Sequence, residues 1–228
     1  MPKSEFDSHI EQYEANHTKN ILITGESPSF FTKYKINDVA EICKSDKPQK
    51  ILDFGAGLGS SLPYWREEFP QSQIICMDVS FLSLLTAKKK YTDTASYCLF
   101  DGQKIPVADN TFDIIFASCV FHHIDEELHV NVLRELRRIL RNGGTFILFE
   151  HNPFNPLTRH AVNTCPFDAN AVLITARQMR KRMREVGYVN ISLAYRIFFP
   201  RALRALRKFE KQLTLIPLGA QYRLYSRK

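Results

Sequence analysis

The chain has 228 residues, of which 44% are hydrophobic and 24% are charged, so it fits an ordinary soluble globular protein of one large domain or two small ones. No apolar run approaches the roughly 18 to 20 residues of a membrane span, and the start lacks the apolar segment of a secretory signal. Five widely spaced cysteines with no C-x-x-C pair argue for a reducing cytoplasm, and against a disulfide framework or a zinc site.

The formal net charge of +7 is placed unevenly, because residues 171–228 hold 14 Lys and Arg residues against only Glu185 and Glu210. Such asymmetry is compatible with an acidic substrate, a membrane surface or nucleic acid. A solvated basic surface is the simpler interpretation, since a charge run alone rarely identifies a partner.

Strand-like and helix-like segments alternate after residue 48, which is typical of an α/β sheet with helices on both faces. We expect residues 1–48 to form an N-terminal helical cap and residues 49–228 the main part of a single structural domain. The apolar periodicity predicts strands at 49–54, 73–78, 96–100, 112–118, 145–150, 188–199 and 221–226, and helices at 58–69, 81–90, 125–141, 178–185 and 201–213. Between them, residues 151–170 are expected to form a long functional loop.

Three glycines, Gly55, Gly57 and Gly59, follow the first strand and open the first helix, which supports a nucleotide-type site at the carboxyl ends of the strands. A dinucleotide fingerprint spaces its glycines G-x-G-x-x-G, whereas here the third glycine comes one position early. The carboxylate of Asp53 would repel a pyrophosphate and attract a cation. The ligand is therefore expected to be cationic near this turn, as S-adenosylmethionine is with its ammonium and sulfonium.

The segment Asp53-Phe-Gly-Ala-Gly-Leu-Gly59 resembles the D/E-x-G-x-G-x-G motif of the class I S-adenosylmethionine-dependent methyltransferases. Residues 48–150 are similar to the small-molecule branch often grouped as type 11, or ubiquinone-biosynthesis-like, methyltransferases. The resemblance implies a doubly wound, Rossmann-like sheet of seven strands, mostly parallel with the last strand antiparallel and with helices on both faces.

The resemblance also implies S-adenosylmethionine as the cofactor. Asp78 matches the family acid that binds the ribose hydroxyls, and Val79 beside it would pack on the adenine. Asp101 matches the acid that binds the adenine amino group. Together with the glycine turn and Asp53, the residues expected to hold the cofactor are Asp78, Val79, Asp101, Gly102 and Ser118.

Methyl transfer from a sulfonium needs a base only when the acceptor carries a proton of high pKa. The candidate catalytic residues lie just past the fourth and fifth strands. After the fourth strand come His122 and His123, of which one could face the acceptor, and at the end of the fifth come Glu150 and His151. Each has an alternative structural role, as a packing histidine or a turn cap, while His160 and Asp168 are weaker candidates and His129 is expected to be solvent-exposed. Only Glu150 is present where a metal-dependent enzyme would need an acid cluster, so we expect no metal.

The acceptor is expected to be a small or lipid-like molecule, acidic in one interpretation of the basic tail, with residues 151–170 and 201–213 as its determinants. The basic helix at 201–213 either packs on the domain with its arginines outward or makes a peripheral membrane contact. Nucleic acid is disfavoured because no recognition fold is visible. Two rival functions are a non-catalytic, methyltransferase-like binding or scaffold protein and an NAD-dependent oxidoreductase.

Overall fold

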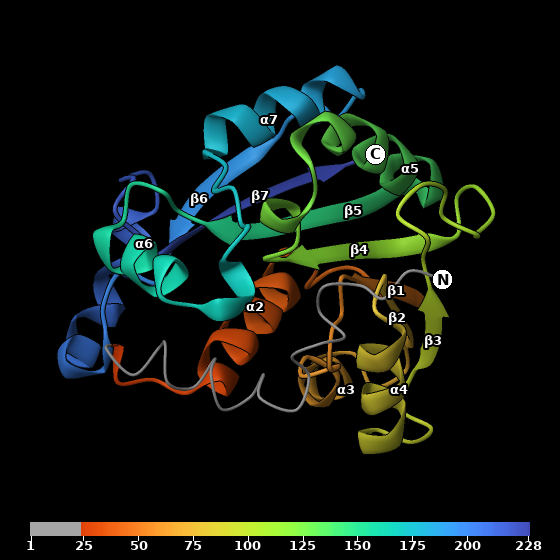
Figure 1. The fold of residues 1–228 in the computed structure, drawn as a ribbon, viewed down its shortest axis with the longest axis horizontal. Helices are drawn as coiled ribbons and strands as arrows, with labels where there is room; N and C mark the ends of the chain where they lie inside the picture. Colours follow the sequence, from red (N-terminus) through yellow and green to blue (C-terminus); the bar gives the residue numbers. More distant parts are fainter. Residues whose placement is uncertain (1–23) are drawn as a thin grey trace.

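A computed structural model describes residues 24–228, apart from the side chain of Phe167, so residues 1–23 of the expected helical cap lie outside the described residues. Seven strands form one sheet in the order β3-β2-β1-β4-β5-β7-β6 (Figure 1). The first five strands run parallel, and β7 is antiparallel to both of its neighbours. The expected fold class is thereby confirmed. The strands are β1 (Lys50–Phe54), β2 (Gln73–Asp78), β3 (Ser96–Leu99), β4 (Phe112–Ser118), β5 (Leu140–His151), β6 (Ser192–Arg196) and β7 (Gln221–Arg227).

Helices cover both faces of the sheet because successive strand residues alternate between two apolar cores. In β1, Leu52 belongs to one core and Ile51 to the other. Figure 1 shows the two helical layers on opposite sides of the strands. One layer holds α2 (Pro28–Ile42), α3 (Leu62–Glu68) and α4 (Phe81–Lys90), and the other holds α5 (His129–Ile139) and α7 (Ala176–Glu185).

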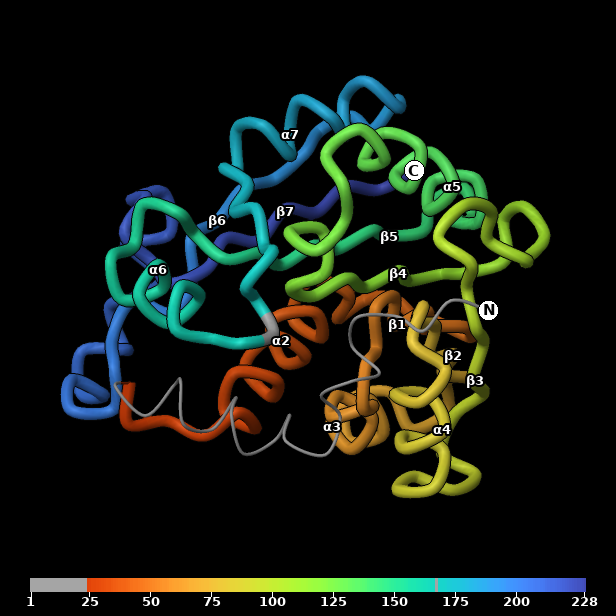
Figure 2. Tube along the Cα trace, in the orientation of Figure 1, coloured from red at the N-terminus to blue at the C-terminus, as the bar shows by residue number. Residues whose placement is uncertain are grey.

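The segment after β5 differs from the expected loop, because it contains a helix, α6 (Pro156–Asn163), and a 3-10 turn, η5 (Pro166–Asp168). The Asn155 side chain caps α6 by accepting a hydrogen bond of 2.9 Å from the Thr158 amide, and Pro156 occupies the first helical position. Both start signals are present in the sequence, so the expectation of a loop was wrong for these residues. Figure 2 shows α6 past the ends of β4 and β5.

The expectation of one continuous helix at residues 201–213 is also wrong. This segment consists of a 3-10 segment, η6 (Arg201–Phe209), and a single α-helical turn, α8 (Glu210–Leu213). Leu203 leaves helical geometry, with φ −106° and ψ 20°. A charged contact holds this segment to the domain, since Arg207 binds Glu26 at 2.6 Å and its guanidinium lies 4.5 Å from the Phe30 ring centre.

Helix α5 begins later and ends earlier than the helix that was expected at residues 125–141. Two short 3-10 turns, η3 (Phe121–His123) and η4 (Glu126–Leu128), precede α5, and β5 starts at Leu140 rather than at residue 145. His129, expected at the surface, is 1% exposed. It donates from Nε2 to the Ile124 carbonyl at 2.8 Å and accepts at Nδ1 from Arg182 at 2.6 Å. These two partners explain its burial.

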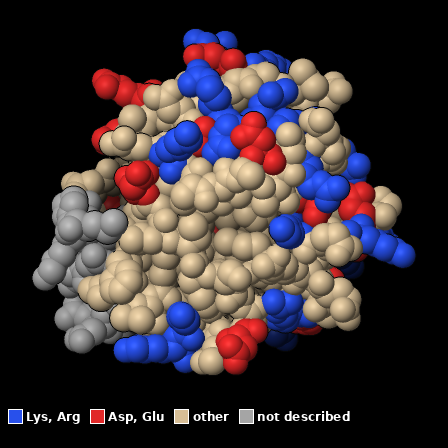
Figure 3. All heavy atoms as spheres, turned by 90° about the vertical axis from the view of Figure 1, so that its right-hand side faces the viewer, with Lys and Arg blue, Asp and Glu red and all other residues tan. Residues whose placement is uncertain are grey.

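Two surface properties bear on function. Within the described part of the chain, no helix combines the length and apolarity needed to cross a membrane. On the face seen in Figure 3, Lys and Arg mix with Asp and Glu around an uncharged centre, so the described residues form no extended basic surface there. This mixing gives nucleic acid no continuous electrostatic footprint on that face.

Candidate functional site

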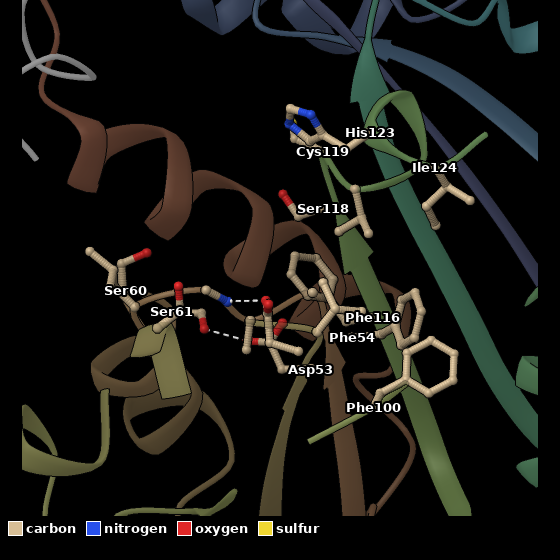
Figure 4. A pocket seen from close by; sticks show the side chains of 18 of the residues that line it. Asp53, Phe54, Ser60, Ser61, Phe100, Phe116, Ser118, Cys119, His123 and Ile124 are labelled. Atoms are coloured by element: carbon tan, nitrogen blue, oxygen red, sulfur yellow. Dashed lines mark hydrogen bonds between the residues drawn. The ribbon is translucent and has the colours of Figure 1, made fainter. Parts of the chain in front are cut away.

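A cavity of about 450 Å³ opens at the carboxyl ends of β1, β2 and β4, where the strand order changes direction. In open α/β sheets this switch point is the usual place for a ligand. The glycine turn lines one end of the cavity, and Cys119, His123 and Asp168 line the other. Figure 4 shows Ser118, Cys119 and His123 leading along one wall away from Asp53.

The glycine turn has a backbone that other residues adopt poorly, with φ of 73° at Gly55 and 52° at Gly57. A Cβ atom on Gly55 would lie 2.3 Å from a methyl group of Val120. A Cβ on Gly57 would meet no protein atom within 4 Å. Gly57 therefore leaves open space on the cavity side, which suits close approach by a ligand. Gly59 does not line the cavity but packs against α4 through Ala87.

Asp53 lies at the end of β1 and lines the cavity, although its residue is only 3% exposed. Its Oδ2 atom accepts a short hydrogen bond from the Ser61 hydroxyl (Figure 4). It also accepts one of 3.0 Å from the Trp65 indole. Burial raises the pKa of Asp53 to about 6, although these two donors favour the ionised form. The carboxylate is thus a buried negative charge at neutral pH, beside the turn that was expected to hold a cation.

Asp78 links the end of β2 to the glycine turn. One carboxylate oxygen accepts from the Gly57 amide and the other from the Ser80 amide, both at 2.8 Å. Val79 beside it is 44% exposed and lines the cavity, which fits its expected packing on an adenine. Asp78 therefore both orders the turn and faces the space that a ligand would occupy.

Asp101 and Gly102 were expected to act together, but only Gly102 lines the cavity. Gly102 lines the cavity, and a Cβ there would meet no protein atom within 4 Å. Asp101 is exposed and is not among the lining residues. Its carboxylate accepts hydrogen bonds from the amides of Gln103 and Lys104, which closes its own turn. A role for Asp101 in holding an adenine stays a prediction.

Two cavity residues that the sequence analysis did not select are Lys35 and Cys119. Lys35 comes from α2, is 8% exposed, and donates from Nζ to the Ser118 hydroxyl at 2.7 Å and to Cys119 Sγ at 3.5 Å. One feature of the sequence points to the position of Lys35: it stands beside the apolar Ile36 in a helix that packs on the sheet. Gln221 also donates to Cys119 Sγ, at 3.3 Å.

These donors alter the chemistry of the thiol. Burial opposes ionisation of Cys119, but the charges of His151 and Lys35 outweigh it and lower its pKa to about 6. Cys119 also has φ of 57°, in the left-handed region that a cysteine rarely adopts. The end of β4 therefore presents a polarised sulfur atom to the cavity.

The expected catalytic pair His122 and Glu150 is brought together behind the cavity wall. Glu150 Oε1 accepts from the amides of Val120 and Phe121 at 2.9 and 2.7 Å, and its Oε2 lies 2.6 Å from His122 Nδ1. Both side chains are 1% exposed, and neither lines the cavity. Although burial disfavours the imidazolium, the charge and hydrogen bond of Glu150, together with the nearby Asp168 carboxylate, hold the pKa of His122 above its usual range.

His123 and Asp168 are the members of this group that reach the cavity. The Oδ1 atom of Asp168 lies 3.3 Å from His123 Nε2 and 3.6 Å from His122 Nε2. His151, the third expected catalytic residue, packs against His122 with ring centres 5.0 Å apart and the rings tilted by 52°, but it does not line the cavity. His160 is exposed on α6, away from this cluster. The catalytic assignments of His122, Glu150 and His151 stay predictions.

Comparisons with known proteins agree with this geometry. Residues 52–148 match the methyltransferase domain family. The chain is 29% identical over 150 residues to a demethylmenaquinone methyltransferase of Thermotoga maritima, covering 66% of this chain and 61% of the relative. It is 35% identical over 108 residues to a malonyl-[acyl-carrier protein] O-methyltransferase of Legionella pneumophila, covering 46% of this chain and 37% of the relative. The chain thus spans less than two thirds of the length of either relative.

A crystal structure of a methyltransferase from Thermotoga maritima shares the fold. It superposes with a TM-score of 0.68 at 16% sequence identity, and the match covers 96% of this chain and 98% of that one. At this identity the likeness concerns the fold alone. The fold, the matched family and the site at the switch point nevertheless agree with one another.

Proposed function

We propose that the chain is a class I S-adenosylmethionine-dependent methyltransferase, which transfers a methyl group from S-adenosylmethionine to a small-molecule acceptor. The observation that carries the proposal is the cavity at the switch point, which combines an open glycine turn with a buried carboxylate. Seven of the nine residues expected to hold the cofactor line it: Asp53, Gly55, Gly57, Asp78, Val79, Gly102 and Ser118.

The residues of the cavity fit the cofactor by charge and by space. Asp53 would attract the ammonium group, because it is a buried negative charge that lines the cavity two residues before Gly55. Asp78 would accept hydrogen bonds from the ribose hydroxyls while it keeps the Gly57 amide in place. The exposed face of Val79 would pack on the adenine.

When bound, S-adenosylmethionine supplies the electrophilic methyl carbon, and the protein aligns the acceptor and excludes water. The wall that runs from Ser118 past Cys119 to His123 gives an acceptor polar contacts beyond the cofactor end of the cavity. Glu150 and His122 would act behind that wall by fixing its shape, and His151 would polarise Cys119. Among these residues His123 and Asp168 line the cavity beyond the cofactor end, so they would contact the acceptor rather than the cofactor.

The acceptor class follows from the relatives and the cavity together. One relative's name gives demethylmenaquinone and the other malonyl-[acyl-carrier protein], and both of these acceptors carry carbonyl oxygen atoms. The cavity wall also offers the apolar side chains of Phe54, Phe116 and Ile124 to an apolar part of an acceptor. We therefore propose an acceptor that carries oxygen atoms on an apolar skeleton, including lipid-like molecules.

A peripheral membrane contact through residues 201–213 is a proposal for delivering a lipid-like acceptor. Three apolar side chains of η6 are exposed, Leu203, Leu206 and Phe209, and basic residues lie between them. Exposed apolar groups next to cations suit an anionic membrane surface. Co-sedimentation with anionic vesicles checks this contact, and binding unchanged in a Leu206→Glu, Phe209→Glu variant would remove it.

The first test is calorimetric titration of the purified chain with S-adenosylhomocysteine, with NAD as the parallel control. We expect micromolar binding of S-adenosylhomocysteine and none of NAD. Transfer of a labelled methyl group to a panel of quinone precursors and acyl thioesters then tests catalysis. Binding without transfer to any acceptor would favour a scaffold protein, and binding of NAD alone would favour an oxidoreductase.

A further inference from the structure

Three potential metal ligands meet at the far end of the cavity from the glycine turn. His122, His123 and Asp168 each offer one ligand atom, and these atoms all lie within 4.8 Å of one another. Within the described part of the chain, no other group of three His, Cys, Asp or Glu residues meets this criterion. No metal was expected because Glu150 alone supplies an acid next to the ends of β4 and β5, whereas Asp168 comes from η5.

The separations of Asp168 from the two imidazoles fit ligands around one ion. Asp168 Oδ1 lies 3.3 Å from His123 Nε2 and 3.6 Å from His122 Nε2. The second separation is too long for a hydrogen bond. Two ligands about 2.1 Å from a tetrahedral zinc ion stand roughly 3.4 Å apart, which falls between the two observed separations.

The surroundings of His122 match those of a metal-bound histidine. Its Nδ1 atom lies 2.6 Å from Glu150 Oε2, so a proton on Nδ1 leaves Nε2 to face Asp168. A carboxylate behind a histidine ligand is the usual way in which proteins fix the ring and its tautomer. Glu150 is itself held by two backbone amides, which makes the orientation rigid.

The charge and accessibility of the group also favour a cation. Two carboxylates, Glu150 and Asp168, face one buried imidazole, and His122 is only 1% exposed. His123 and Asp168 retain 20% and 15% side-chain exposure and line the cavity, so an ion has a route to the site. Two histidines and one carboxylate leave at least one coordination position open, as in catalytic rather than structural sites.

We propose that His122, His123 and Asp168 bind a divalent transition-metal ion whose open position faces the cofactor cavity. Glu150 is the positioning residue that orients His122. As an addition that rests on the proposed methyl transfer, the ion binds an oxygen atom of the acceptor and holds it near the methyl group. Oxygen-bearing acceptors are the class that such a nitrogen and oxygen site accommodates.

The test is titration of the metal-depleted full chain with zinc chloride, followed by calorimetry. We expect one site, weakened by at least about 100-fold in both Asp168→Asn and His123→Ala, and by about 10-fold in Glu150→Gln, because losing a residue that only orients a ligand typically costs 10- to 100-fold. Cobalt(II) bound to the wild-type chain should give visible absorption bands that Asp168→Asn lacks. Circular dichroism checks that each variant is folded.

Two matched controls make the outcome specific. His160→Ala removes an exposed histidine of α6 and should leave zinc affinity unchanged. Cys119→Ser removes the polarised thiol of the same cavity and should do the same. Zinc affinity that survives Asp168→Asn, or that disappears in Cys119→Ser, would overturn the proposal. Since zinc binding needs neither cofactor nor acceptor, its failure is distinguishable from failure of S-adenosylhomocysteine to bind.

Discussion

The two ends of the cavity are built in different ways. At the cofactor end, formed by residues 50–102, each polar side chain lies at the end of its own strand and bonds within one or two neighbouring turns, as Asp78 does with Gly57 and Ser80. At the acceptor end, formed by residues 119–168 with Lys35, the contacts join distant segments, as Glu150 does with His122. Local rules therefore shape the first end, and tertiary packing shapes the second.

The largest effect that we predict tests the packing of the acceptor end. Glu150→Ala leaves two backbone amides and the His122 ring without their shared buried partner. We expect the free energy of unfolding to fall by about 3–5 kcal/mol, the usual cost of breaking a buried charged pair by removing one member. Urea denaturation measures the change, with Glu150→Gln as the variant that keeps the shape. A loss below about 1 kcal/mol would mean that this end is not held by Glu150.

The next effect concerns cofactor affinity alone. Asp78→Ala should weaken S-adenosylhomocysteine binding by about 1.5–3 kcal/mol, because hydrogen bonds to a charged group are lost and the Gly57 amide loses its acceptor. Calorimetry gives the value. Asp101→Ala tests the predicted adenine contact by the same measurement, and we expect a smaller loss, since Asp101 bonds its own turn and does not line the cavity. Equal losses of affinity in the two variants would indicate that the adenine contacts Asp101, although Asp101 does not line the cavity.

The pH dependence of cofactor binding tests the charge of Asp53. Because burial raises its pKa to about 6, Asp53 is ionised at pH 7 and becomes neutral as the pH falls below 6. Its protonation stabilises the free fold but removes the negative charge that a cationic ligand needs, so affinity should fall on acidification.

The expected loss in S-adenosylhomocysteine affinity approaches about tenfold per pH unit below pH 6. Calorimetry from pH 5 to pH 8 measures it. Asp53→Asn should bind weakly at every pH and show a flatter profile. If the wild-type chain and Asp53→Asn showed the same pH dependence of affinity, Asp53 would not be the group that attracts the charge of the ligand.

The features that could be predicted from the sequence also differ between locally built and packed parts of the molecule. Strands β2 and β4 and helix α4 have the expected bounds, because their apolar patterns and flanking turns are local. His129 was misplaced because its burial depends on Arg182, a partner from α7. The meeting of His123 with Asp168 was equally out of reach, since no spacing rule brings η5 to η3.

The smallest predicted effect asks whether the two ends are independent. Asn155→Ala removes the cap of α6 and a hydrogen bond of 2.7 Å to the Leu218 carbonyl. We expect a loss of about 1 kcal/mol in the free energy of unfolding, the usual value for a helix N-cap. S-adenosylhomocysteine affinity should not change, because Asn155 lies outside the cofactor end. If affinity falls together with stability, α6 supports the cofactor turn as well, and the division between a locally built end and a packed end does not hold.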